Sequence, residues 1–225
     1  MSEPFLSIRD LRVRRGGQPV LHIDELSVGR GELVLLCGEN GSGKSTLILA
    51  AAGLLDLEAG TIHLQGKPFH RGTAPAPMQL RRRLALVQQT PYLFATSVLR
   101  NTTYGLRLRG VPRPQRRQRA RAVLEQLGIA HLAGRRADRL SVGEQKLVAL
   151  ARALVLDCPG LLLDEVTASL DEVVRERVLE LIRNLVERQG VSILMASHLE
   201  RASADLPARR ADIHAGRLRP PGTGS

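Results

Sequence analysis

The sequence predicts an α/β fold, with a parallel sheet as its core, an antiparallel β subdomain at the N-terminus and an inserted helical subdomain. The main observation is a continuous apolar run, Leu33–Cys37, which leads through a glycine-rich loop into a helical stretch at residues 45–54; this is the opening unit of a parallel sheet. Later apolar runs alternate with helical segments, which extends the same pattern. Hydrophobic residues make up 43% and charged residues 24%, and these values exclude a fibrous or wholly disordered chain.

The first elements are two strands. Residues 5–13 alternate apolar and polar side chains, and residues 20–28 do so less regularly. Gly16-Gly17 lies between them and is typical of a hairpin turn. We therefore expect an antiparallel pair before the parallel core.

Three more buried strands are predicted at residues 84–87, 160–163 and 191–195, where apolar residues follow one another without alternation. Between the last two, residues 171–188 repeat apolar side chains at helical spacing, which gives one apolar stripe. The sequence thus predicts a strand–helix–strand unit. Residues 211–218 predict a shortened last strand.

Residues 97–139 have a different character, because their pattern is helical and their first half is rich in arginine. We interpret them as the centre of a helical subdomain inserted at about residues 95–155. The tail, residues 220–225, has no means of burying apolar area and is expected to be disordered. No internal repeat is visible, so residues 1–219 are expected to form one domain. No apolar run approaches the ~18 residues of a membrane span.

The glycine-rich loop fits the pattern G-x-x-x-x-G-K-[ST] of a phosphate-binding loop, so the predicted core is that of a P-loop NTPase. It requires a buried strand before it and a helix after it, because backbone N–H groups and the helix N-terminus together receive the phosphates. Lys44 would reach the β- and γ-phosphates, and Ser45 would bind Mg²⁺. The predicted nucleotide-binding residues are Gly38, Glu39, Asn40, Gly41, Ser42, Gly43, Lys44, Ser45 and Thr46.

A second site follows the predicted strand at residues 160–163, which ends in the paired carboxylates Asp164 and Glu165. Two acids after a strand are usually a loop or a helix cap. With a phosphate-binding loop upstream, the first is placed to hold Mg²⁺ through water and the second to polarise an attacking water.

Residues 140–146, Leu-Ser-Val-Gly-Glu-Gln-Lys, followed by residues 147–154, resemble the signature motif of ATP-binding cassette (ABC) ATPases, and the resemblance covers nearly the whole chain. Residues 87–94 look like the Q-loop of that family, with Gln89 as its glutamine. Residues 168–171 look like the D-loop, and residues 193–198 look like the strand that ends in the switch histidine. Five motifs in the family's order are very specific.

The resemblance implies a head-to-tail homodimer that encloses two ATP molecules. Ser141 and Gly143 would face the γ-phosphate bound by the other copy. Glu165 would be the general base, His198 would hold the γ-phosphate and the water, and Gln89 would link the Mg²⁺ site to the partner. Asp171 would couple the two sites. ATP and Mg²⁺ are the implied cofactors, and residues 1–219 would be one nucleotide-binding domain.

The implied function is that of an ATP-hydrolysing subunit bound to integral membrane permease subunits at the cytoplasmic face of the membrane. Residues 92–111 look most like importers of small oxyanions such as tungstate or phosphate, which would also use an extracytoplasmic substrate-binding protein. One alternative is a soluble ABC ATPase that acts on nucleic acid or ribosomes, which the net charge of +11 favours and the 2% aromatic content disfavours. A small-molecule kinase would leave residues 140–154 unexplained.

Some positions depart from the family's pattern. Val142 stands where the first signature glycine is usual. A valine is costly there if its backbone needs a positive φ or a close approach to the nucleotide, and costs little if the backbone is already helical. Arg15 stands where an aromatic residue commonly stacks on adenine; its guanidinium could stack or be solvated. Val166 and Leu199 replace a usual proline and a usual acid outside the phosphate shell. For the arginine cluster at residues 107–121 three interpretations stay open: a solvated helical face, attraction to anionic lipid headgroups, or nucleic-acid binding.

Overall fold

The computed structural model describes residues 3–197 and 206–219. Its strands are β1 (Leu6–Arg15), β2 (Gln18–Val28), β3 (Leu33–Cys37), β4 (Ala59–Leu64), β5 (Lys67–His70), β6 (Leu84–Val87), β7 (Gly160–Asp164), β8 (Ser192–Ala196), β9 (Ala208–His214) and β10 (Arg217–Leu218). Its α-helices are α1 (Lys44–Ala51), α2 (Met78–Arg81), α3 (Val98–Leu108), α4 (Arg113–Gln126), α5 (Val142–Leu154) and α6 (Glu172–Glu187), and two 3₁₀ turns lie at Ala130–Leu132 and Ala137–Arg139.

The larger sheet has the strand order β10-β9-β3-β8-β7-β6. All neighbouring pairs from β9 to β6 are parallel, and only β10 runs antiparallel to its neighbour. This confirms the predicted α/β fold with a parallel core. Because β3 and β7 both end at the same edge of the sheet, the loops that follow them are brought together there.

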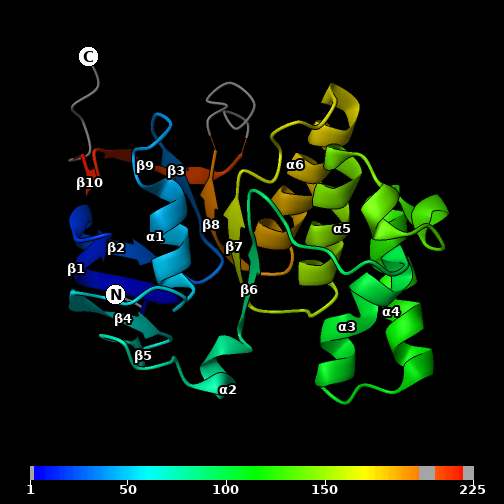
Figure 1. Cartoon of the computed structure of the whole chain (residues 1–225), viewed down its shortest axis with the longest axis horizontal. Coiled ribbons are helices and arrows are strands. Elements are labelled where there is room, and N and C mark those ends of the chain that lie inside the picture. Colours follow the sequence, from blue (N-terminus) through cyan, green and yellow to red (C-terminus); the bar gives the residue numbers. More distant parts are fainter. Residues whose placement is uncertain (1–2, 198–205, 220–225) are drawn as a thin grey trace.

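Both faces of this sheet are covered, as Figure 1 shows: α1 and the antiparallel strands lie on one side, and α5 and α6 lie on the other. The central strands β3, β7 and β8 are therefore buried at every position and mostly apolar. Leu35 and Met195 belong to the core that contains α5 and α6, whereas the adjacent Leu36 and Leu194 belong to the core that contains α1. The continuous apolar runs of the sequence result from this two-sided burial.

The smaller sheet is antiparallel, with the order β2-β1-β4-β5. The predicted hairpin is confirmed, since β1 pairs with β2 across Gly16-Gly17. Strands β4 and β5 were not predicted. At Gly60, φ is 92° and a Cβ atom would lie 2.5 Å from the carbonyl oxygen of Asp10, so only glycine fits where β4 meets β1.

The arginine-rich segment forms α3 and α4, which pack against each other and against α5. Ser97 caps α3 by accepting a hydrogen bond from the N–H of Arg100. The buried side chain of Asn101 accepts from the N–H of Phe94 and donates to its carbonyl oxygen. These bonds fix the start of the helical region to the loop that follows β6.

The C-terminal segment differs from its prediction. Residues 211–218 were expected to form one shortened strand. The structure instead starts β9 at Ala208, reverses at Ala215 and Gly216, which have φ of 45° and 75°, and pairs β10 back onto β9. The predicted disordered tail, residues 220–225, lies outside the described residues. Every helix in the described ranges is too short or too polar to cross a lipid bilayer.

Candidate functional site

The predicted phosphate-binding loop, residues 38–45, connects β3 to α1 and curls over the start of that helix. Gly43 precedes the helix with φ of 108°, a conformation that other residues rarely adopt. The buried ammonium of Lys44 donates to the carbonyl oxygens of Gly38 and Glu39 at 2.7 and 2.8 Å. The loop thus folds around a fixed positive charge, the arrangement that receives phosphate groups.

The β9–β10 turn supports this loop. The N–H of Gly216 donates to the carbonyl oxygen of Ser42 at 2.8 Å. A Cβ atom on Gly38, where φ is 152°, would lie 2.2 Å from the carbonyl oxygen of Ile213, so the loop lies directly against β9. Sequence analysis missed this support, because the two segments come from opposite ends of the chain.

The second predicted group lies at the carboxyl end of β7. Asp164 ends the strand and Glu165 follows it, and both side chains are buried. Glu165 has φ of 50°, and its carboxylate accepts a hydrogen bond from the side-chain amide of Gln89 at 2.7 Å. The structure therefore joins the predicted Q-loop glutamine directly to the predicted general base.

These two groups meet in a cavity of about 690 Å³. The predicted site residues that line it are Arg15, Asn40, Gly41, Gly43, Lys44, Ser45, Thr46, Gln89 and Glu165. Pro19, Val20, Ala215 and Gly216 also line it and were not predicted. An aromatic platform is not among these lining residues, and Arg15 is exposed at this cavity.

The oxygen donors here fit Mg²⁺. Ser45 and Gln89 line the cavity and Asp164 is buried beside Glu165, so a hydroxyl, an amide and a carboxylate are available. In the described ranges, three or more His, Cys, Asp or Glu side chains do not gather in one place. Mg²⁺ needs no such cluster, because it commonly takes one or two protein ligands and completes its shell with water and phosphate oxygens.

The signature segment, residues 140–146, lies outside the lining of this cavity among the described residues. Ser141 caps α5 in a reciprocal arrangement: its hydroxyl accepts from the N–H of Glu144, and its own N–H donates to the Glu144 carboxylate at 2.7 Å. This backbone N–H lowers the pKa of Glu144. Ser141 is exposed, so the tip of α5 faces outward.

Val142 and Gly143 form the first turn of α5. Val142 is 63% exposed and begins the helix, and its φ is not positive. The backbone at this position therefore does not need the positive φ that would make valine costly. A Cβ atom on Gly143 would lie 3.3 Å from the carbonyl oxygen of Ser169, so a larger residue would press on the loop after β7.

Lys146 was not predicted as a site residue. Its side chain is only 6% exposed, and its ammonium donates to the carbonyl oxygens of Glu165 and Ala168 at 3.2 and 2.8 Å. Burial lowers the pKa of Lys146, while the charges of Glu165 and Asp164 oppose that shift. The signal that could have identified Lys146 was a charged residue on the helix face that is otherwise apolar and buried.

Asp171 is the N-cap of α6, and its carboxylate accepts from the N–H of Val174 at 2.9 Å. Ser169 just before it has φ of 65°. Val166 is buried after the carboxylate pair. His198 and Leu199 lie outside the described residues, so the predicted switch histidine has no described position.

Comparison with known proteins gives a consistent result. The family model described as ABC transporter matches residues 21–168. The Fe(3+) ions import ATP-binding protein FbpC of Streptomyces coelicolor is 37% identical over 224 residues, which cover 99% of this chain and 63% of that protein. The methionine import ATP-binding protein MetN of Brucella abortus is 32% identical over 198 residues, which cover 88% of this chain and 54% of that protein.

Among solved structures, cbiO1 from Clostridium perfringens, described as part of the ABC transporter complex cbiONQ, superposes with a TM-score of 0.82 and 28% identity. The match covers 97% of this chain and 88% of cbiO1. In contrast, the chain spans between about half and two thirds of the length of the two curated relatives.

Proposed function

This chain belongs to the ABC transporter family, and on that premise we propose that it is the ATP-binding and ATP-hydrolysing subunit of a membrane transporter. The observation that carries the proposal is the direct hydrogen bond between Gln89 and Glu165 at the edge of a cavity that the phosphate-binding loop also lines. The phosphate-binding loop, the buried carboxylate of Glu165 and the side chain of Gln89 thus line one cavity.

Glu165 is the general base of this proposal. Its carboxylate lies at the cavity, and the Gln89 amide fixes its orientation. From there it can accept the proton of a water molecule that attacks the γ-phosphate. Lys44 neutralises charge on the phosphates, and the loop N–H groups hold them in line. Ser45, Asp164 and Gln89 would hold Mg²⁺, which would supply positive charge to stabilise the phosphate groups.

The site is expected to be completed by a second copy. Ser141 is exposed at the N-terminus of α5, where an anion is favoured, and the described cavity lining contains no residue from the signature segment. A head-to-tail homodimer would bring Ser141 and Gly143 of each copy to the γ-phosphate of the other, and Asp171 would couple the two sites.

We further propose that the transporter imports a small solute through separate permease subunits, with this chain bound at the cytoplasmic face. Two relatives with import functions support this direction. The relatives' names refer to Fe(3+) ions and methionine, so a small oxyanion stays a prediction about the solute, as does an extracytoplasmic binding protein. The alternative of a nucleic-acid or ribosome ATPase is not favoured by these relatives.

A dimerisation experiment tests the site. With Mg·ATP, the Glu165→Gln variant of the full chain should form a stable dimer by light scattering, because bound ATP is not consumed. Adding Ser141→Glu should keep it monomeric, since a second negative charge would face the γ-phosphate. The control is Glu187→Gln, the same substitution at an exposed position of α6, which should leave ATP turnover at the wild-type rate. A persistent dimer with Ser141→Glu would remove Ser141 from the shared site.

A pull-down in detergent tests the transport role. We expect an integral membrane protein to co-purify with the tagged full chain. ATP hydrolysis that RNA or DNA stimulates, with stimulation that fades steeply as salt rises, would instead support the alternative.

A further inference from the structure

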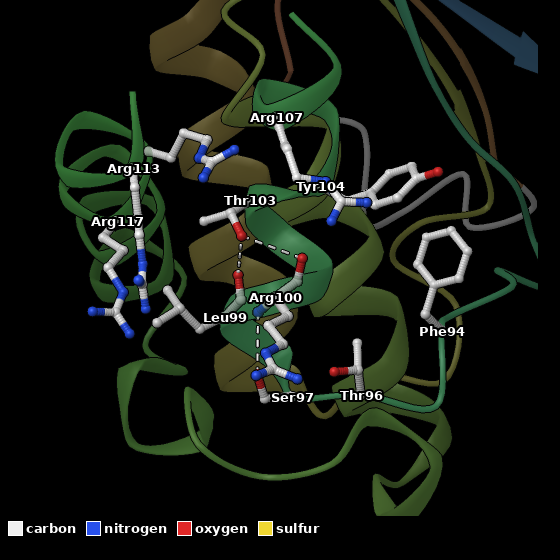
Figure 2. Close-up of a pocket in the computed structure, with 11 residues that line it drawn as sticks. Phe94, Thr96, Ser97, Leu99, Arg100, Thr103, Tyr104, Arg107, Arg113 and Arg117 are labelled. Atoms are coloured by element: carbon white, nitrogen blue, oxygen red, sulfur yellow. Dashed lines mark hydrogen bonds between the residues drawn. The ribbon is translucent and has the colours of Figure 1, made fainter. Parts of the chain in front are cut away.

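A second cavity, of about 590 Å³, lies in the helical region between α3 and α4. Five arginines line it, Arg100 and Arg107 from α3 and Arg113, Arg116 and Arg117 from α4. Figure 2 shows Arg113 and Arg117 on one helix and Arg100, Thr103 and Arg107 on the other, with Ser97 at the start of α3. We call this cavity the arginine pocket.

The spacing of these arginines places them on facing sides of the two helices. On α3, Arg100, Thr103 and Arg107 follow an i, i+3, i+7 pattern, which is one helix face. On α4, Arg113 is followed at i+3 and i+4 by Arg116 and Arg117. Because α3 packs against α4, both faces border the same space.

Carboxylates of the described residues do not neutralise these five guanidinium groups. Among the described residues, none of them forms a salt bridge or donates a side-chain hydrogen bond; only Arg107 has a recorded contact, 5.2 Å above the ring of Tyr104. Arginines elsewhere do have carboxylate partners. Examples are Arg14 with Glu58, Arg135 with Glu144, and Arg209 with Glu32.

The segment of the sequence that contains the pocket residues has no acidic residues over a long stretch. Residues 59–124 contain thirteen lysines and arginines and no aspartate or glutamate, so the charge of this segment exceeds the chain's net charge of +11. In addition, α4 begins without a side-chain cap and without an acid in its first turn. Its first arginines thus stand at the positive end of the helix dipole, where cations are disfavoured. A bound anion would neutralise the arginines and would also interact favourably with the positive end of the α4 dipole.

We propose that the arginine pocket binds a ligand that carries two or more phosphate groups. This site is separate from the cavity of about 690 Å³ that Lys44, Gln89 and Glu165 line, which we call the nucleotide cavity. Planar guanidinium groups bind phosphate oxygens in pairs, and five of them around one cavity suit a polyanion better than a single charge. The Ser97 hydroxyl accepts from the N–H of Arg100, which leaves its own proton free to donate to an anion. A volume of about 590 Å³ is typical of small-molecule sites. The phosphates could belong to a soluble polyphosphate or to lipid headgroups.

Nucleic acid is the less favoured ligand. Aromatic residues are only 2% of the chain, and these five arginines line one cavity. Arg119 and Arg121 are also exposed on α4 but do not line the pocket, so they provide matched controls with the same charge on the same helix.

The test is calorimetric titration of the full chain with inorganic tripolyphosphate, with EDTA present to remove divalent ions. The variant Arg113→Gln/Arg117→Gln should weaken binding at one site by at least about tenfold. The control Arg119→Gln/Arg121→Gln should keep that site, as should Lys44→Ala, which removes charge from the phosphate-binding loop instead. Thermal unfolding of each variant verifies that it is folded.

Equal losses in the two double variants would overturn the proposal, because the attraction would then be a diffuse effect of charge. Loss in Lys44→Ala alone would also overturn it, because the nucleotide cavity would then be the only phosphate site. Binding of single-stranded RNA without binding of tripolyphosphate would overturn it in favour of a nucleic-acid surface. ATP binding, measured separately, reports on the proposed nucleotide site and does not depend on these results.

Sedimentation with vesicles of phosphatidylcholine, with and without phosphatidylglycerol, distinguishes the two sources of phosphate. Binding to the anionic vesicles that is lost in Arg113→Gln/Arg117→Gln and kept in Arg119→Gln/Arg121→Gln would identify lipid headgroups. Binding of tripolyphosphate without binding of vesicles would identify a soluble ligand.

Discussion

The nucleotide cavity and the arginine pocket are similar in size, at about 690 and 590 Å³, but they hold charge in opposite ways. At the first, Lys44 is buried and hydrogen bonded to backbone carbonyl oxygens. Lys146 is also buried, and the charges of Glu165 and Asp164 act on its ammonium. At the second, arginines line the space without carboxylate partners among the described residues. Charges held in a fixed geometry suit a reaction, whereas unneutralised charges suit the capture of a ligand.

The largest expected effect tests whether the first cavity is a reaction site. Glu165→Gln should lower ATP turnover by roughly 10²-fold or more, because an amide cannot accept the proton of the attacking water. ATP binding should persist. Phosphate release and nucleotide titration measure the two quantities. Unchanged turnover would mean that Glu165 is not the general base, and the first cavity would then not differ from the second as a reaction site.

The next effect concerns the fixed positive charge. Lys44→Ala should weaken ATP binding by about 10- to 100-fold, the scale of a lost hydrogen bond to a charged group. Equilibrium dialysis of ATP with the full chain measures it. Arg113→Gln/Arg117→Gln should leave ATP affinity unchanged; if both variants weaken it equally, the two cavities are not independent.

The sequence predicted most of the nucleotide cavity, because the phosphate-binding loop and the strands that flank it are recognisable from nearby residues alone. Gln89 and Glu165 were also predicted, although only the structure shows them in contact. Gly216 and Lys146 were not predicted, because each contacts a segment that is not adjacent to it in the sequence. Gly216 donates to Ser42, and Lys146 donates to Glu165. The β4–β5 pair was not predicted either, because Gly60 in β4 and Pro68 in β5 both argue against a strand.

Lys146 provides a pH test of the buried charge. Its pKa is lowered by burial, so the folded state binds fewer protons than the unfolded state between its folded pKa and the usual value of 10.5. The free energy of unfolding of the wild type should therefore rise with pH in that window, relative to Lys146→Met. Urea unfolding of both proteins at neutral pH and at about pH 10 measures the difference. An unchanged difference would mean that burial does not affect the charge.

Val142→Gly tests whether the exposed tip of α5 limits the reaction. Because Val142 already has helical geometry, glycine should cost less than about 1 kcal/mol of stability and change ATP turnover less than about tenfold. Steady-state hydrolysis and urea unfolding measure these. A larger rise in turnover would show that valine impairs the site that a second copy is expected to complete.

The smallest effect concerns the arginine pocket without its ligand. Arg113 and Arg117 are like charges at i, i+4 on α4, so Arg113→Gln/Arg117→Gln should stabilise the free protein by about 0.2–0.5 kcal/mol at low salt. The gain should vanish at high salt. Urea unfolding at two salt concentrations measures it, and destabilisation at low salt would mean that the arginines hold the helices together.

The contact between Gly216 and Ser42 has a consequence for synthesis on the ribosome. The phosphate-binding loop is translated well before the turn that supports it, and β3 is likewise translated well before its partner strand β9. We expect a nascent chain that stops before residue 216 to lack a finished nucleotide site. Capacity to bind ATP should therefore appear abruptly, only after β9 and β10 emerge from the exit tunnel.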